Sequence, residues 1–511
     1  MHSVVNNDVT LLRGIAISTL LHRNASVLKD SAGSGASYEL SKQTKTHLVG
    51  FISHNWSIDR KVKFMCLVFR FNLVPAMFVT FVVTLIVFVL QSLELLPLLR
   101  CWNDANQDFI PRGLLCQLLG PSTFLVILLV WHEISPLFRK DERLVFLDKA
   151  CINQTDEALK REGIRNLGTY IMYSNELVVI FSDQYLQKLW TLYECATFLL
   201  CHPPERISVI PPEHVYCVVL GMLIIASVSL LDSMMRVELI VSPLFDLAAR
   251  KDIHDIIIAL VLVPAFFGGW YPLRKKGLLQ MRINDTVRSF NVDTAVCAVE
   301  EDRELVKQGM VADARHKRLV KVDETSDSVA IGAYEVFVKK HLPRALDATF
   351  GRAGMRYSVV LVLFCPVLFL GFDITSGLLV MGDLRAGLAS IIHFATLIFG
   401  VFPLCLAFYS RMTKFCPLVT GYLHVSFMLG SASMAAALTY ATTVLSHFAQ
   451  KLALRSDPLF AIPCALFLTS TALALRVYKV DHVHISIRPF GQSGSLSSIF
   501  PQRSSDEGIK T

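Results

Sequence analysis

The side chains most able to do chemistry lie within residues 144–201, LVFLDKACINQTDEALKREGIRNLGTYIMYSNELVVIFSDQYLQKLWTLYECATFLLC. Near the end of this stretch Glu194 follows Trp190 by four residues, so a helix there places both side chains on one face. A carboxylate beside an aromatic ring can serve as a reaction centre, because it stabilises positive charge that develops on a substrate. We therefore predict Glu194 as the catalytic residue and Trp190 as a ligand contact.

Short apolar runs alternate with helical segments in this region, which predicts a parallel sheet flanked by helices. Ligands of such folds bind beyond the carboxyl ends of the strands, so the polar residues that follow each run are candidate contacts. The predicted strands are residues 47–56 (HLVGFISHNW), 143–147, 176–181 and 206–210, and the predicted helices are residues 57–70, 157–174 (capped by Asp156) and 187–201. The ligand contacts predicted from these strands are Ser53, His54, Trp56, Asp148, Ser182 and Asp183.

The composition indicates that much of the chain lies in a lipid bilayer. The chain has 511 residues, of which 53% are hydrophobic and only 18% charged, a more apolar balance than soluble proteins have. A membrane-spanning helix needs about 20 apolar residues. Eight segments meet this requirement or nearly do: residues 71–91, 113–131, 214–231, 256–273, 357–374, 386–409, 419–445 and 458–475.

The distribution of lysine and arginine predicts the orientation of these spans. Basic residues concentrate before the first span and after the second, fourth, sixth and eighth, whereas the intervening loops carry fewer. Cytosolic loops are the ones enriched in basic residues. The sequence therefore predicts an integral, multi-pass membrane protein with its N and C termini and both soluble regions in the cytosol. The identity of the membrane stays open.

Domain organisation follows from the spans and the soluble segments between them. Within residues 274–355, an apolar stripe at helical spacing predicts packing against the first soluble domain or the membrane surface. The stripe consists of Ile331, Tyr334, Phe337, Val338 and Leu342. The predicted units are a flexible tail (1–46), an α/β domain (47–212) interrupted by a two-span hairpin at about 71–133, a second hairpin (213–273), a cytosolic mixed or helical region (274–355), a four-span bundle (356–478) and a disordered tail (479–511).

Several classes of protein are disfavoured. The net charge of +7 comes without a basic stripe interleaved with aromatic residues, so we expect no nucleic acid partner. The twelve cysteines show no CxxC pair and no zinc-ligand spacing, so we expect neither a disulfide framework nor a metal site. His393 and His424 lie inside predicted spans, where histidine most often hydrogen-bonds a neighbouring helix.

Three segments resemble known families. FISHNW, residues 51–56, resembles the first box of TIR (Toll and interleukin receptor) domains. VVIFSDQYLQKLWTLYEC, residues 178–195, resembles the plant-type TIR stretch in which a strand, FS, a tyrosine and a WCxxE-like helix follow one another, with Thr191 in place of the family cysteine. LDKACINQTD, residues 147–156, resembles the D-x-x-CINQ segment of fungal heterokaryon-incompatibility domains. The resemblance covers about residues 47–212, less the membrane hairpin.

The resemblance implies a flavodoxin-like fold and two kinds of activity. TIR domains signal by associating with themselves or with other TIR domains. Some also hydrolyse or cyclise NAD at the nicotinamide–ribose bond, and their essential glutamate corresponds to Glu194. NAD is then a substrate rather than a bound cofactor, and Trp56 stacks on a flat ring.

The leading hypothesis is a membrane-anchored, TIR-like signalling protein that acts by association of its cytosolic domain, with NAD cleavage as an additional activity. Its partners would be the lipid bilayer and other TIR-like domains. Two alternatives stay open: an NAD glycohydrolase or cyclase proper, and a channel or transporter with a regulatory TIR-like domain.

Overall fold

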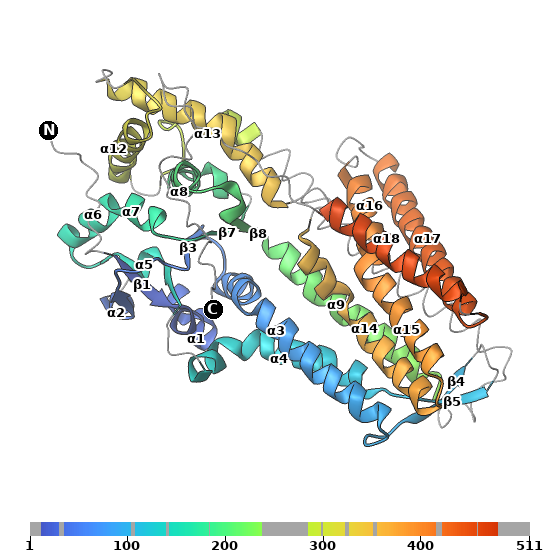
Figure 1. Ribbon diagram of the computed structural model, residues 1–511. Helices are drawn as coiled ribbons and strands as arrows, with labels where there is room; N and C mark the ends of the chain where they lie inside the picture. Colours follow the sequence, from blue (N-terminus) through green and yellow to red (C-terminus); the bar gives the residue numbers. More distant parts are fainter. Residues whose placement is uncertain are drawn as a thin grey trace, which may run out of the picture.

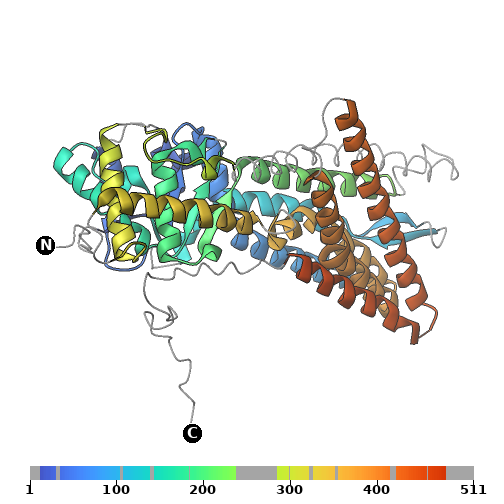
Figure 2. The same ribbon diagram turned by 90° about the horizontal axis from the view of Figure 1, so that it is seen from above.

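The computed structural model describes residues 12–29, 35–103, 108–138, 143–182, 184–237, 285–297, 300–321, 326–350, 355–414, 422–456 and 458–478. An α/β part built on a sheet lies at one end of the molecule, and long helices extend away from it (Figure 1). The view from above shows the same two parts end to end (Figure 2). Predictions for residues 256–273, Asp183 and residues 479–511 lie outside the described residues.

The sheet of the α/β part has six strands in the order β2-β1-β6-β3-β7-β8. β6, β3, β7 and β8 are parallel, and they correspond to the four apolar runs predicted as strands. β1 is antiparallel to both of its neighbours, so the sheet is mixed rather than purely parallel. The strands are β1 (Arg13–Ala16), β2 (Ser41–Gln43), β3 (Gly50–His54), β6 (Leu144–Phe146), β7 (Leu177–Ile180) and β8 (Ile207–Ile210).

The N-terminal segment departs from the prediction of a flexible tail over residues 1–46. Residues 12–29 and 35–46 instead form β1, α1 (Ile17–Ala25), α2 (Gly35–Glu39) and β2. The physical reason is burial, because Leu12, Ile15 and Leu20 are completely enclosed in the main core. Without this segment the edge of β6 and the apolar face beside it would be exposed to water.

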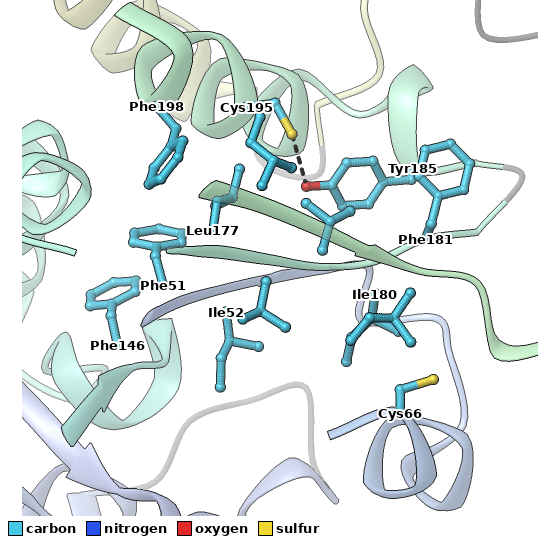
Figure 3. Close-up of a cluster of buried hydrophobic side chains, with 14 of the residues drawn as sticks. Phe51, Ile52, Cys66, Phe146, Leu177, Ile180, Phe181, Tyr185, Cys195 and Phe198 are labelled. Carbon is cyan, nitrogen blue, oxygen red and sulfur yellow. Dashed lines mark hydrogen bonds between the residues drawn. The ribbon is translucent and has the colours of Figure 1, made fainter. Parts of the chain in front are cut away.

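Helices cover both faces of the sheet. α3 (Arg60–Ser92) lies on one face and α8 (Leu189–Cys201) on the other, as the positions of Cys66 and Cys195 show in Figure 3. Between the two layers the side chains of β3 and β7 are all buried, and the rings of Phe51 and Phe146 stack with centroids 4.4 Å apart. Strands covered on both faces read as continuous apolar runs, which is why the sequence identified them.

The helix predicted over residues 157–174 is divided in two. α6 (Glu157–Arg165) begins at Asp156, whose carboxylate accepts hydrogen bonds from the N–H groups of Ala158 and Leu159, so the predicted cap is confirmed. The break falls at Asn166, and α7 (Leu167–Met172) follows it. The short helix α5 (Asp148–Cys151) precedes them at the end of β6.

The second soluble region belongs to the same α/β part. α12 (Glu301–His316) and α13 (Asp327–Phe350) pack against α8. The hydroxyl of Thr197 in α8 donates to Asp313 (2.8 Å) and lies 2.9 Å from the hydroxyl of Tyr334. Of the predicted stripe, Tyr334, Phe337, Val338 and Leu342 are buried in the main core, so packing against the first domain is confirmed.

Six helices in the described part of the chain are long and apolar enough to cross a membrane, which is compatible with an integral membrane protein. The segment predicted as the seventh span forms α17 (Tyr422–Ala453), which is not among the six. The six candidate spans are Arg60–Ser92 (α3), Leu115–Phe138 (α4), Pro212–Met234 (α9), Tyr357–Val380 (α14), Leu384–Met412 and Pro458–Tyr478. Leu384–Met412 comprises α15 (Leu384–Thr396), a π-helical turn (Leu397–Val401) and most of α16 (Phe402–Lys414), and Pro458–Tyr478 includes α18 (Ala461–Tyr478).

The end of the helical bundle far from the sheet is held by close packing and buried polar contacts. A hairpin of β4 (Leu99–Asn103) and β5 (Asp108–Arg112) joins α3 to α4 there. Asp373 of α14 accepts hydrogen bonds from the backbone N–H groups of Cys116 (3.1 Å) and Gln117 (2.9 Å), which lie in the first turn of α4. A carboxylate from a neighbouring helix thus caps α4.

The closest approach in this bundle predicts a packing-sensitive position. A methyl group at Gly377 would lie 1.9 Å from the carbonyl oxygen of Pro111, so Gly377→Ala should force α14 away from β5. We expect a loss of about 1–3 kcal/mol, seen as a lower unfolding temperature of the detergent-solubilised protein. Gly430→Ala in α17 is the matched control, because a methyl group there meets nothing within 4 Å. Equal unfolding temperatures for the two variants would contradict this packing.

Candidate functional site

The candidate site lies at the carboxyl ends of β3 and β7. The strand that follows β3 in the chain, β6, lies on one side of β3, and the next strand, β7, lies on its other side. The strand order therefore reverses between β3 and β7. Such a switch point is where ligands of open α/β sheets bind. Ser53 and His54 end β3 and pair in register with Val179 and Ile180 of β7, and Ser182 follows β7.

Glu194 lies at this switch point. Its carboxyl group accepts a hydrogen bond from the buried hydroxyl of Ser53, which also bonds the hydroxyl of Tyr185. The Tyr185 hydroxyl in turn lies 3.3 Å from the sulfur of Cys195 (Figure 3). The predicted catalytic residue and the predicted contact Ser53, far apart in sequence, are thus brought together.

The environment of Glu194 favours its neutral form. Burial raises the pKa of the Glu194 carboxyl to about 8, the nearby charge of Asp148 adds to the rise, and the hydrogen bond from Ser53 opposes it. The carboxyl group is therefore mostly protonated at neutral pH. A cation placed beside it would favour ionisation, so the site can respond to a positively charged ligand.

Trp56 and Asp148 form the neighbouring part of the site. The Trp56 indole N–H donates to Asp148 (3.0 Å). The ammonium groups of Lys63 and Lys149 lie 4.5 and 4.4 Å from the centre of the Trp56 ring. Burial raises the pKa of Asp148. Trp56 thus lies where the sequence predicts, and its ring contacts protein cations of the site.

Three buried polar atoms in this region have no hydrogen-bond partner among the described residues: Nε2 of His54, Nδ2 of Asn55 and the hydroxyl of Ser182. Burial lowers the pKa of His54 to about 3, and the charge of Lys63 lowers it further, so its imidazole is neutral. Leaving such a group unpaired costs about 1–3 kcal/mol. A polar ligand or water bound at the carboxyl ends of β3 and β7 would recover part of this cost.

Trp190 does not join this group, contrary to prediction. Its indole N–H donates to the carboxylate of Asp302 in α12 (3.4 Å), and its side chain lines a hollow of about 40 Å³ between α6, α7, α8 and α12. The four-residue spacing from Glu194 amounts to about 6 Å along the helix, enough to place Trp190 beside α12. Asp302, the partner of Trp190, lies more than a hundred residues away in sequence. The spacing between Trp190 and Glu194 therefore could not predict this contact.

Thr191, the departure from the TIR pattern, has a structural role. Its hydroxyl donates to the carbonyl oxygens of Tyr185 and Lys188 (3.1 Å to the latter). These bonds hold the turn η3 (Tyr185–Gln187) against the start of α8. Thr191 therefore helps to position the Tyr185 ring whose hydroxyl reaches Ser53.

The segment that resembles the CINQ motif is also structural. Cys151 is buried, and burial raises the pKa of its thiol to about 12, so it is not a reactive thiolate. The side chain of Asn153 accepts hydrogen bonds from the N–H groups of Thr155 and Asp156, both at 2.9 Å. The motif shapes the turn that leads from the end of β6 into α6.

Three residues of the site were missed by sequence reasoning. Tyr185 completes the hydrogen-bonded group around Ser53, and Lys63 and Lys149 contact Trp56. Lys149 directly follows the predicted contact Asp148, which was an available signal. The sequence gave no signal for Lys63, because a lysine in the first turns of a helix usually faces water.

Among the described residues, no group of three or more histidine, cysteine, aspartate and glutamate side chains is placed to hold a metal ion. No protein-family model matches the chain, and neither a curated protein nor a solved structure is significantly similar to it. The argument for function therefore depends on the geometry of the site.

The raised pKa of Glu194 makes a prediction about stability. Its ordinary pKa of 4.5 applies to the unfolded chain and about 8 to the folded one, so between these values the folded state binds more protons. Stability contributed by this group is therefore lost as pH rises from about 5 to 8. Glu194→Gln removes this loss of stability. The unfolding temperature of the variant minus that of wild type should therefore be about 2–4 °C larger at pH 8 than at pH 5.

Thermal unfolding of both proteins at pH 5 and pH 8 in the same detergent measures this difference. Other buried acids titrate in both proteins and cancel in the comparison. A difference that stays constant between the two pH values would mean that Glu194 has an ordinary pKa.

Proposed function

We propose that the protein is a membrane-anchored signalling protein whose TIR-like cytosolic domain cleaves the nicotinamide–ribose bond of NAD at Glu194. The observation that carries the proposal is the Glu194 carboxyl group bonded to Ser53 at the switch point of the sheet, beside buried polar atoms that have no hydrogen-bond partner in the described part of the chain. A carboxyl group with a perturbed pKa is typical of functional sites, and ligands of open α/β sheets bind at such switch points.

The topology supports a TIR-like domain. Numbered along the chain, the parallel strands β3, β6, β7 and β8 lie in the order 2-1-3-4. This is the beginning of the flavodoxin-like order 2-1-3-4-5, in which the ligand lies between the first and third strands. Here Ser53 lies near the end of the first of those two strands, and Ser182 follows the third. The mixed edge formed by β1 and β2 is an addition to that pattern.

Cleavage of the nicotinamide–ribose bond can be assisted by a carboxylate, and it needs no general acid to protonate the leaving group. The bond between ribose C1′ and the nicotinamide nitrogen breaks with its electron pair moving to the nitrogen, so nicotinamide leaves neutral. The ribosyl group becomes an oxocarbenium-like cation, which the ionised Glu194 stabilises. Water adds to C1′ and loses one proton, which gives ADP-ribose.

Charge complementarity links the raised pKa of Glu194 to this substrate. The nicotinamide ring of NAD is a pyridinium cation, and its approach favours the ionised carboxyl group. A site that is neutral when empty and anionic when occupied discriminates against neutral rings of the same shape. Ser53 donates to the carboxylate and holds it in place during the reaction.

Anchoring follows from the connections between sheet and helices. β3 leads within a few residues into α3, and β8 leads through Pro211 directly into α9. Two strands of the sheet are thus tied to candidate spans. We propose that both soluble regions face the cytosol, and that association with a second TIR-like domain regulates the activity of the Glu194 site.

The reaction is tested with the full-length protein in detergent or lipid nanodiscs. Wild type should release nicotinamide from NAD, and Glu194→Gln should reduce kcat by at least about 100-fold. Glu162→Gln, which removes an exposed carboxylate on α6, is the matched control and should keep full activity. The rate for wild type should rise with pH toward 8, because the reactive form of Glu194 is ionised.

Two outcomes would contradict the catalytic part of the proposal. One is equal nicotinamide release by wild type and Glu194→Gln. The other is no release by wild type together with NAD-independent ion or solute flux in reconstituted vesicles, which would favour the channel or transporter alternative.

Orientation has its own test. Asp108→Cys, in β5 at the far end of the bundle, and Ala158→Cys, in α6, both introduce exposed thiols. In sealed vesicles with the cytosolic face outward, an impermeant thiol reagent should label Ala158→Cys and spare Asp108→Cys, with wild type as the background. Labelling of both, or of Asp108→Cys alone, would overturn the proposed topology.

A further inference from the structure

A continuous series of hydrogen bonds leads through the protein interior to Glu194. The sulfur of Cys195 lies 3.3 Å from the hydroxyl of Tyr185, the contact drawn in Figure 3. The Tyr185 hydroxyl bonds the hydroxyl of Ser53, and Ser53 donates to the carboxyl group of Glu194. These four side chains come from β3, η3 and α8. Together they are called the relay below.

The inner groups of the relay are enclosed and keep their hydrogens. Tyr185 and Cys195 are completely buried, and Ser53 is 1% exposed. Burial raises the pKa of the Cys195 thiol to about 12 and that of the Tyr185 hydroxyl well above its ordinary value. At neutral pH each of the three groups therefore carries one hydrogen and can donate one hydrogen bond.

The number of hydrogens determines the direction of the bonds when Glu194 is ionised. A carboxylate has no hydrogen, so Ser53 must donate its only one to Glu194. In its bond with Tyr185 the Ser53 oxygen can then only accept. Tyr185 has thereby used its own hydrogen, so its oxygen can only accept from the thiol of Cys195. Every bond of the relay then points toward the carboxylate.

A neutral Glu194 also allows the opposite direction. Its acid hydrogen can be donated to Ser53, whose hydroxyl then donates to Tyr185, and Tyr185 donates to the sulfur of Cys195. Ionisation therefore selects one of two arrangements. Hydrogen bonds that point the same way strengthen one another by about 10–30% each. The two groups beyond Ser53 thus stabilise the carboxylate, although their hydrogen bonds do not reach it directly.

We propose that Tyr185 and Cys195 are positioning residues, which act through the hydroxyl of Ser53 to orient and stabilise the reactive carboxylate. The inference rests on the proposed function for its effect on NAD cleavage, but the coupling along the relay does not depend on that reaction. Loss of a positioning residue should therefore shift the pH at which the site becomes active, more than the rate that it reaches at high pH.

The first test measures the ionisation of Glu194 in the full-length protein in nanodiscs. Tyr185→Phe should raise the midpoint of the infrared titration of this carboxyl group by about 0.2–0.6 pH units, because part of the hydrogen bond to a charged group is lost. The midpoint of the kcat/KM profile for NAD, which reports the free enzyme, should rise equally.

Tyr170→Phe is the matched control for this test. Tyr170 is also buried, but its hydroxyl donates to the carbonyl oxygen of Cys151 (3.3 Å), outside the relay. The control should leave both midpoints at the wild-type values. A lower unfolding temperature of Tyr185→Phe with unchanged midpoints would give Tyr185 a structural role only and overturn the proposal.

The second test follows the far end of the relay. The S–H stretching band of Cys195 is assigned as the band that Cys195→Ala removes, with Cys66→Ala, on the opposite face of the sheet, as the control. The band should move to lower wavenumber as Glu194 ionises, because the thiol then becomes a donor to Tyr185. In Glu194→Gln it should be independent of pH. A wild-type band that does not respond to pH would overturn the proposal, and this test still decides if Tyr185→Phe does not fold.

The outcomes separate the relay from the proposed reaction. A moving S–H band without release of nicotinamide by wild type would support the relay and refute the reaction. Release of nicotinamide that depends on Glu194, together with a fixed S–H band, would refute the relay and leave the reaction standing.

Discussion

The pairing of β3 with β7 is the constraint on which the site depends. Phe51 through His54 align with Leu177 through Ile180, although the two strands are separated in sequence by two candidate spans. The antiparallel packing of α3 on α4 returns the chain to its starting side, so the hairpin adds length without separating the strands. Loop-closure entropy grows only slowly with length, which makes such an insertion tolerable.

Burial at the end of β3 then determines the protonation states of the site residues. Ser53, near the end of β3, bonds Glu194, and the next two residues, His54 and Asn55, are buried. In this environment the carboxyl of Glu194 and the imidazole of His54 are both neutral, while two lysines stay close to Trp56. Three buried polar atoms of the site have no hydrogen-bond partner among the described residues, and a polar ligand would supply such partners.

The sequence predicted the elements whose signals are local. β3, β6, β7 and β8 were visible as apolar runs, and Asp156 as a helix cap, because both signals lie within a few residues. β1 was missed because it has only four residues and because its burial depends on pairing with β2 and with β6, which lies far away in sequence. Trp190 was misplaced because its partner Asp302 comes from a distant helix. Ser53 and Glu194 were predicted separately, but their hydrogen bond depends on long-range strand pairing.

The most direct test of the account is an infrared titration of the Glu194 carboxyl group, obtained as the difference between wild type and Glu194→Gln. The account predicts loss of a protonated carboxyl band with a midpoint near the pKa of about 8. It also predicts that a non-cleavable NAD analogue with a carbocycle in place of the ribose lowers this midpoint, because its pyridinium ring favours the carboxylate. A midpoint near the ordinary value of 4.5, or one that the analogue leaves unchanged, would contradict it.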